Sequence, residues 1–112
     1  MSFEIRIHTG ADHLRMALSG EIDLAVSPRV REALLACLGN GQAVEVDLSE
    51  VSYIDSSGVA TLVEGLQLAR QQGVEFTLSG VGGTVMKVLK LARLDEVFTI
   101  RQSPRAVGQG AA

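Results

Sequence analysis

The fold is decided by one stretch near the middle of the chain, AVEVDLSEVSYIDSSGVATLVEGL, from Ala43 to Leu66. Its first part alternates apolar and polar residues, which is typical of a half-buried strand; Val44, Val46 and Leu48 are the apolar positions. Its second part has the apolar spacing of an amphipathic helix, expected over 57–72. The core-facing residues of this helix are Val59, Leu62, Val63, Leu66 and Ala69. A strand that passes directly into such a helix is a building block of α/β folds.

The rest of the chain repeats this pattern on both sides of the central stretch. Strands are expected over 3–8, 13–20, 73–81 and 96–100, and helices over 27–38 and 82–94. The first two strands form a hairpin around the turn GAD, and residues 20–26 (GEIDLAV) form a loop. The order is therefore ββαβαβαβ. Strands separated by helices of this length pair mostly in parallel, with a hairpin strand at the edge, which predicts a single α/β domain.

The two flanking helices carry recognisable start signals and apolar faces. Ser27 is placed to cap the first of them, and Pro28 suits its first helical position. Its core-facing residues are Val30, Ala33, Leu34, Cys37 and Leu38. The other helix should turn Val85, Leu89 and Ala92 inward and Lys87, Lys90 and Arg93 outward. The single cysteine, Cys37, is expected to be a packed core thiol.

Length and composition indicate one globular domain. The chain has 112 residues, of which 46% are hydrophobic and 21% charged. We expect a domain over 1–100, followed over 101–112 by a short C-terminal helix or a frayed tail that begins with Ser103 and Pro104. A net charge of −3 with scattered basic residues and no Trp argues against nucleic acid as a partner. No segment resembles a signal peptide or a membrane span, which predicts a cytoplasmic protein without direct membrane insertion.

Catalysis and metal binding find little support in the residue pattern. A nucleophilic serine needs a base, normally histidine, and the two histidines, His8 and His13, flank the first hairpin turn. No cysteine pair or histidine spacing matches a metal site. We therefore expect a protein that is not an enzyme and has no cofactor or metal.

A glycine-rich turn, SGVGGT from Ser79 to Thr84, follows a strand and opens a helix. That context suits a phosphate. The turn lacks the Lys-Ser/Thr of a P-loop, and Val85 stands where a dinucleotide-binding motif requires Gly or Ala. A tight strand-to-helix connection is the simpler interpretation, and nucleotide binding at Gly80–Thr84 stays open.

The segment DSSG, Asp55 to Gly58, stands at the junction between the central strand and its helix. Ser56 or Ser57 is placed to accept hydrogen bonds from the first amides of the helix, and Gly58 permits a close backbone approach. A hydroxyl at this position also suits modification, because a phosphate there would meet the positive end of the helix dipole.

Three segments together resemble a known family. LSGEID (18–23), VDLSEVSYIDSSG (46–58) and VMKVLKLARLDEVFTI (85–100) look like a STAS domain, and more narrowly like the bacterial anti-sigma factor antagonists. The likeness runs from about residue 3 to residue 100, in the same element order. It implies a single STAS-like fold.

The resemblance implies a protein switch controlled by phosphorylation. In that family, the unphosphorylated antagonist binds an anti-sigma factor that is also a serine kinase and so releases a sigma factor; a serine phosphatase resets the switch. By position, the phosphoacceptor corresponds to Ser57, with Ser56 as the second choice. The neighbouring acids are Asp55 and Asp23, and Gly58 stands at the helix N-terminus. The candidate partner surface consists of Leu24, Ala25, Val59 and Ala60.

A second subfamily of small STAS proteins offers a different function. Its members are accessory subunits that dock on the ATPase of ABC systems for lipid transport, and they often have glycine where this chain has Ser57. That serine favours the phosphorylation switch, since only a hydroxyl can carry the phosphate. The sequence leaves open the identity of the partner and sigma factor, the input signal and the oligomeric state.

Overall fold

The computed structural model describes residues 3–102 and contains the expected order of elements. The elements are β1 (Glu4–Thr9), β2 (His13–Ile22), α1 (Ser27–Leu38), β3 (Ala43–Ile54), α2 (Ser56–Gln72), β4 (Phe76–Ser79), α3 (Gly83–Leu91) and β5 (Thr99–Arg101). This confirms the order ββαβαβαβ. The expected C-terminal helix or frayed tail, with Ser103 and Pro104, lies outside the described residues.

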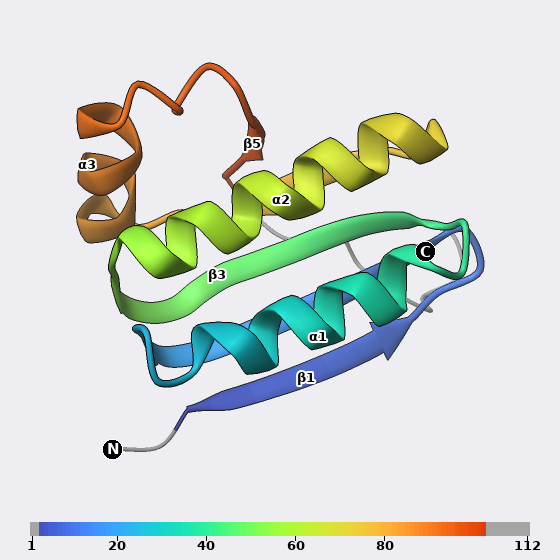
Figure 1. The fold of residues 1–112 in the computed structure, drawn as a ribbon, viewed down its shortest axis with the longest axis horizontal. Helices are drawn as coiled ribbons and strands as arrows, with labels where there is room; N and C mark the ends of the chain where they lie inside the picture. Colours follow the sequence, from blue (N-terminus) through green and yellow to red (C-terminus); the bar gives the residue numbers. More distant parts are fainter. Residues whose placement is uncertain (1–2, 103–112) are drawn as a thin grey trace.

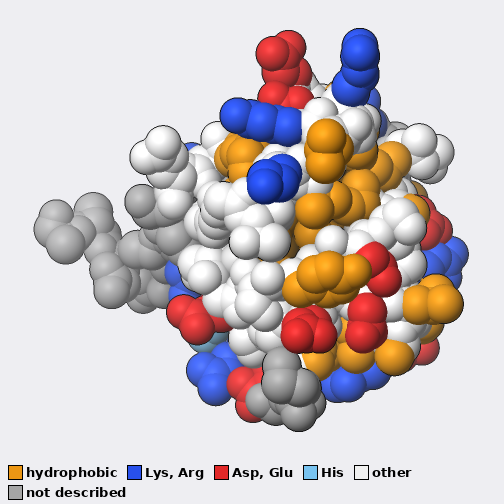
Figure 2. Space-filling model, turned by 90° about the vertical axis from the view of Figure 1, so that its left-hand side faces the viewer, with side chains coloured by type: hydrophobic (Ala, Val, Ile, Leu, Met, Phe, Trp, Pro, Cys, Tyr) orange, Lys and Arg blue, Asp and Glu red, His pale blue; other side chains and the backbone are white. Residues whose placement is uncertain are grey.

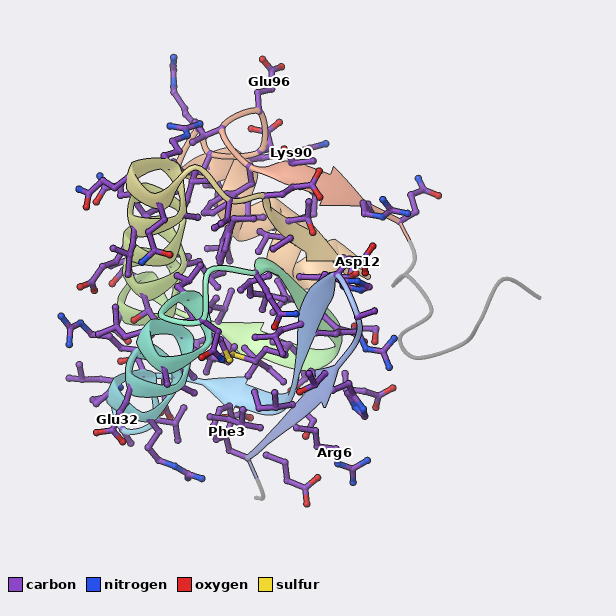
Figure 3. All side chains as sticks on the ribbon, turned by 90° about the vertical axis from the view of Figure 1, so that its right-hand side faces the viewer. Phe3, Arg6, Asp12, Glu32, Lys90 and Glu96 are labelled. Atoms are coloured by element: carbon purple, nitrogen blue, oxygen red, sulfur yellow. The ribbon has the colours of Figure 1, made fainter. Side chains whose placement is uncertain are left out.

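The strands form one mostly parallel sheet in the order β1-β2-β3-β4-β5. β1 pairs antiparallel with β2, from Glu4 opposite Ser19 to Thr9 opposite Leu14, and the other neighbours are parallel. Because each parallel connection moves one place in the same direction, right-handed crossovers bring the helices to one face. α1 and α2 lie side by side over that face (Figure 1). Seen from the side, the helices and the sheet form two layers (Figure 3).

The core lies between these layers and follows the predicted strand alternation. Every second residue of the inner strands is buried beneath the helices: Leu14, Met16 and Leu18 on β2, Val44, Val46 and Leu48 on β3, and Phe76 and Leu78 on β4. Gly65 lets α2 approach closely, since a Cβ there would stand 3.1 Å from Phe76 Cζ. Burial of each large side chain contributes about 1.5–3 kcal/mol.

The opposite face of the sheet carries polar side chains that are nevertheless buried. Glu45 is 2% exposed, and its Oε2 accepts a hydrogen bond of 2.7 Å from Ser79 Oγ. His13, Asp47 and Thr77 are also buried on this side. The alternation in the sequence predicted polar residues here but not their burial.

Three strand boundaries differ from the prediction. β2 continues through residues 20–22, which were expected to be loop, because Gly20 adopts a φ of 97° and register shifts keep the strand paired as far as Ile22 opposite Ile54. β3, expected over 43–51, likewise extends to Ile54. β4 is shorter than predicted because left-handed Gly73 ends α2 and left-handed Gly80 turns the chain after Ser79.

Two predictions about the helices were wrong. Ser27 is the buried first residue of α1, not its cap; the Asp23 carboxylate instead accepts from the amides of Ala25 and Val26 just before the helix. Ala92 is exposed, because α3 ends at Leu91 and only Val85 and Leu89 of that helix are fully buried. The expected outward positions Lys87, Lys90 and Arg93 are exposed, and Cys37 is a buried free thiol, as predicted.

Candidate functional site

The DSSG segment stands where β2 and β3 extend beyond the rest of the sheet. β3 pairs with β4 only as far as Asp47 but continues with β2 to Ile54. The Asp55 amide donates to the Ile22 carbonyl at 3.1 Å, which ties the start of α2 to the end of β2. The 23–26 loop and the first turn of α2 are therefore neighbours.

Asp55, and neither serine, caps α2. Its Oδ1 accepts from the amides of Ser57 at 2.9 Å and Gly58 at 3.2 Å. The same oxygen accepts from Ser57 Oγ at 2.6 Å. The expectation that Ser56 or Ser57 would provide the cap was wrong, because the carboxylate one residue earlier occupies the position from which a side chain reaches these amides.

These contacts favour the ionised form of Asp55. The Ser57 hydroxyl is the main cause that lowers the pKa of the Asp55 carboxyl; partial burial opposes it, and the amides of Gly58, Ser57 and Leu24 lower it further. The Leu24 amide belongs to the loop between β2 and α1. One negative charge therefore connects that loop with the first turn of α2.

The two serines differ in exposure and in hydrogen bonding. Ser56 is exposed at the first position of α2, whereas Ser57 is half-buried and donates its hydroxyl to Asp55. The next residue, Gly58, is buried, and a Cβ there would stand 2.7 Å from Ile54 Cγ1 and 2.8 Å from Ile22 Cγ2. Glycine is therefore required for this close approach to the sheet, as the sequence suggested.

The 23–26 loop places the other predicted site residues nearby. Asp23 Oδ1 accepts from Ala25 N at 3.0 Å, so this acid shapes its own loop. Leu24 is 72% exposed and Ala25 is exposed. Of the two α2 positions in the candidate partner surface, Ala60 is exposed and Val59 is buried.

An apolar groove of about 710 Å³ begins at Ser56 and runs between α2 and the end of α3. Its α2 wall contains Ser56, Val59, Ala60, Val63, Glu64 and Gln67, and its other wall contains Val88, Ala92 and Leu94. Hydrophobic side chains form a continuous band across this side of the molecule (Figure 2). The groove was not predicted from the sequence: Val63 and Ala92 were expected in the core, and Val88 had no assigned role. The sequence feature that could have indicated the groove is the apolar stripe of α3, which contains more apolar residues than the two that α3 buries in the core.

Other candidate positions do not join this site. His13 is buried beside Asp12, with 3.0 Å between Nδ1 and Oδ1, and is part of the polar face of the sheet. Within residues 3–102, no three His, Cys, Asp or Glu side chains gather closely enough to hold a metal ion. In the Gly80–Thr84 turn, Gly80 adopts a φ of 62° close against Ser49. No helix within residues 3–102 has the length and apolar character needed to cross a membrane.

Similarity to known proteins supports one family. The anti-sigma-B factor antagonist of Listeria monocytogenes is 31% identical over 102 residues, which cover 90% of this chain and 89% of the relative. The intermembrane phospholipid transport system binding protein MlaB of Escherichia coli is 37% identical over 83 residues, which cover 70% of this chain and 79% of MlaB.

Solved structures show the same fold. An anti-sigma factor antagonist from Mycobacterium paratuberculosis superposes with a TM-score of 0.84 at 22% identity, over 91% of this chain and 87% of that one. The Bacillus cell fate determinant SpoIIAA in its phosphorylated form superposes with a TM-score of 0.68 at 18% identity, over 90% and 92% of the two chains. The STAS domain family model matches residues 2–106, so this chain belongs to the STAS domain family.

Proposed function

We propose that this protein is an anti-sigma factor antagonist that works as a phosphorylation-controlled partner switch. Unphosphorylated, it binds an anti-sigma factor that is also a serine kinase, and a sigma factor is released. Phosphorylation of the DSSG turn separates the complex, and a serine phosphatase restores binding. The observation that carries this proposal is an exposed hydroxyl, Ser56, at the first position of α2 and at the mouth of an apolar groove. The 31% identity to an anti-sigma-B factor antagonist supports it.

The geometry favours Ser56 over Ser57 as the phosphoacceptor. The position within the motif alone favours Ser57 as the phosphoacceptor. However, the Ser57 hydroxyl is half-buried and donates to Asp55 at 2.6 Å, so a phosphate on it would break this bond and place its charge against the carboxylate. Ser56 is open to a kinase and its modification leaves the cap intact. Ser57 then has a structural role and remains the second candidate.

Electrostatics explains how a phosphate would act at this position. A phosphoserine carries nearly two negative charges, which the N-terminus of α2 stabilises by about 0.3–1 kcal/mol. The fold therefore tolerates the modification. Two unit charges about 6 Å apart near a surface repel by on the order of 3 kcal/mol before salt screening, and every 1.4 kcal/mol is tenfold in affinity. A partner that buries this turn beside Asp55 and the Asp23 loop would then lose roughly 100-fold in affinity.

Mass spectrometry with site mapping tests the proposal. The wild type, Ser56→Ala and Ser57→Ala would each be incubated with ATP and the purified kinase-type anti-sigma factors of the same genome. We expect one phosphate on Ser56, retained in Ser57→Ala and absent in Ser56→Ala. A phosphate on Ser57 would keep the switch and move its site. No phosphate and no complex with any of these kinases would overturn the proposal.

A second candidate function has its own support. The 37% identity to MlaB over 70% of the chain favours an accessory subunit that docks on the ATPase of a lipid-transport ABC system without phosphorylation. Affinity purification from the native host separates the two functions. An ABC ATPase that co-purifies, together with an unmodified DSSG turn in growing and stressed cells, would establish this second function and exclude the first.

A further inference from the structure

We infer that the groove between α2 and α3 receives an amphipathic helix of the anti-sigma partner, with acidic residues on the edge that lies over α3. This inference rests on the proposed function and adds the element of the partner that is recognised. It extends the docking surface from the DSSG turn to α3, which no predicted site residue reached.

The walls of the groove favour side-chain contacts over strand pairing. One wall is α2, and the other consists of Val88 of α3 with Ala92 and Leu94 of the turn that follows it, so neither wall is a strand edge that could take up an added strand. Along α2, the lining residues Ser56, Ala60, Val63 and Gln67 follow a helical stripe. This stripe spans roughly 16 Å, because a helix rises about 1.5 Å per residue. About three turns of a partner helix match that length.

The apolar surface continues beyond the groove onto the outer side of α3. Leu91 is 80% exposed and, at 100° per residue, lies between the groove-lining residue Val88 and the exposed Lys87 around the helix. A large exposed leucine next to an apolar groove enlarges one continuous patch rather than forming an isolated surface residue. A helix seated in the groove would bury Leu91 under its edge.

The charges that border the patch indicate the chemistry of the occupant. Lys87, Lys90 and Arg93 of the α3 region are exposed, and no salt bridge between the described residues involves them. Basic side chains border the α3 end of the hydrophobic band (Figure 2). On the α2 wall, by contrast, Glu64 is paired with Arg31 through contacts of 2.8 and 2.9 Å. Asp95 and Glu96, in the turn that follows, also form no salt bridge between the described residues, so residues 87–96 carry three basic and two acidic side chains. The net charge of this segment is therefore positive, which an acidic edge over α3 would complement.

The position of Ser56 gives the groove a direct connection to the switch. Ser56 lines the groove at its end, so a phosphate there would have to lose its water when an apolar helix docks beside it. The modification would then oppose docking without any change in the fold.

Binding measurements with matched variants test this inference. The probe is each purified kinase-type anti-sigma factor of the same genome, and affinities are measured by calorimetry at two salt concentrations. Ala60→Glu places a charged side chain in the groove from an exposed position and should weaken binding more than roughly tenfold. Its control is Ala36→Glu, at another exposed alanine, on α1, which should stay within about twofold. The double variant Lys87→Glu/Lys90→Glu should weaken binding and remove most of its salt dependence, whereas Arg70→Glu at the far end of α2 should do neither.

The outcomes separate this inference from the function on which it rests. If the wild type binds none of these kinases, the proposed function fails and the inference fails with it. If the wild type binds and Ala60→Glu matches Ala36→Glu, the groove is not the docking site, although the switch stands. If the double variant keeps the wild-type affinity and salt dependence, the acidic edge is wrong. If sedimentation of the chain alone shows a dimer that Ala60→Glu dissolves, the groove belongs to a second copy of this chain.

Discussion

Asp55 Oδ1 and Ser57 Oγ lie 2.6 Å apart at the first turn of α2, and the same carboxylate oxygen accepts two main-chain amides of that turn. The Leu24 amide, in the loop between β2 and α1, also lowers the pKa of this carboxyl. A phosphate on this turn would therefore act most strongly on Asp55, the residue whose hydrogen bonds hold the turn together.

Removing the Asp55 carboxylate should destabilise the protein in a pH-dependent way. Asp55→Ala should lower the free energy of unfolding by about 1–2 kcal/mol at pH 7, since the helix loses its cap. The pKa of Asp55 is lowered in the folded protein, so its contribution is fully present above the unfolded value near pH 4 and is lost as pH falls through the lower folded value. Urea unfolding at pH 7 and near pH 3 should show the wild type and the variant converging at the acid end. An unchanged difference would contradict the assigned role of the carboxylate.

The two serines should differ in their effects on stability. Ser57→Ala removes the hydroxyl that donates to Asp55 and should cost about 1 kcal/mol. Ser56→Ala, at an exposed position, should stay within about 0.5 kcal/mol of the wild type. Thermal or urea unfolding of both variants measures this. Equal losses would show that exposure does not separate the two residues.

Gly58 should not tolerate a side chain. In Gly58→Ala the new Cβ would lie 2.7 Å from Ile54 Cγ1, which forces core side chains or α2 to move and should destabilise by about 1–3 kcal/mol. Gly83→Ala is the matched control, because nothing lies within 4 Å of a Cβ there and alanine favours helix. If both variants unfold at the same urea concentration, the close approach at Gly58 does not contribute to stability.

The stability of the protein should depend on the hydrogen bond between Ser79 and the buried Glu45 on the polar face of the sheet. Ser79→Ala removes the hydroxyl that donates to Glu45 Oε2 and should cost about 1–3 kcal/mol, because Glu45 is 2% exposed and cannot replace this bond with bulk water. Ser52→Ala, an exposed serine of β3, should have little effect. Chemical unfolding of the two variants gives the comparison, and an equal response would argue against a structural role for the Ser79 bond.

The regular parts of the fold were predictable because their signals are local. Val44, Val46 and Leu48 alternate with period two, and Val59, Leu62 and Leu66 follow the helical period; all are buried as expected. The mostly parallel pairing, with a hairpin strand at the edge, followed from the lengths of the connections.

The errors came from contacts between segments distant in sequence. Nothing in GEID shows that a bulge at Gly20 keeps β2 paired as far as Ile22, since the pairing depends on residues about thirty positions later. The groove likewise exists only once α3 lies beside α2, so Val63 and Val88 looked like core residues or had no role. The DSSG turn was predicted, but the group that caps α2 depends on backbone angles that the sequence does not show. Asp55 has an extended ψ of −174° and points its carboxylate at the helix amides.

The strand order β1-β2-β3-β4-β5 has a consequence for how the protein is made. Each strand pairs with the one synthesised just before it, so no strand waits on the ribosome for a partner that has not yet been translated. The sheet can grow in the direction of translation, and each new helix closes over an apolar strip that has just formed. In folds whose first strand pairs with the last, the first strand keeps an unpaired, aggregation-prone edge until synthesis ends. The five strands described here avoid that interval.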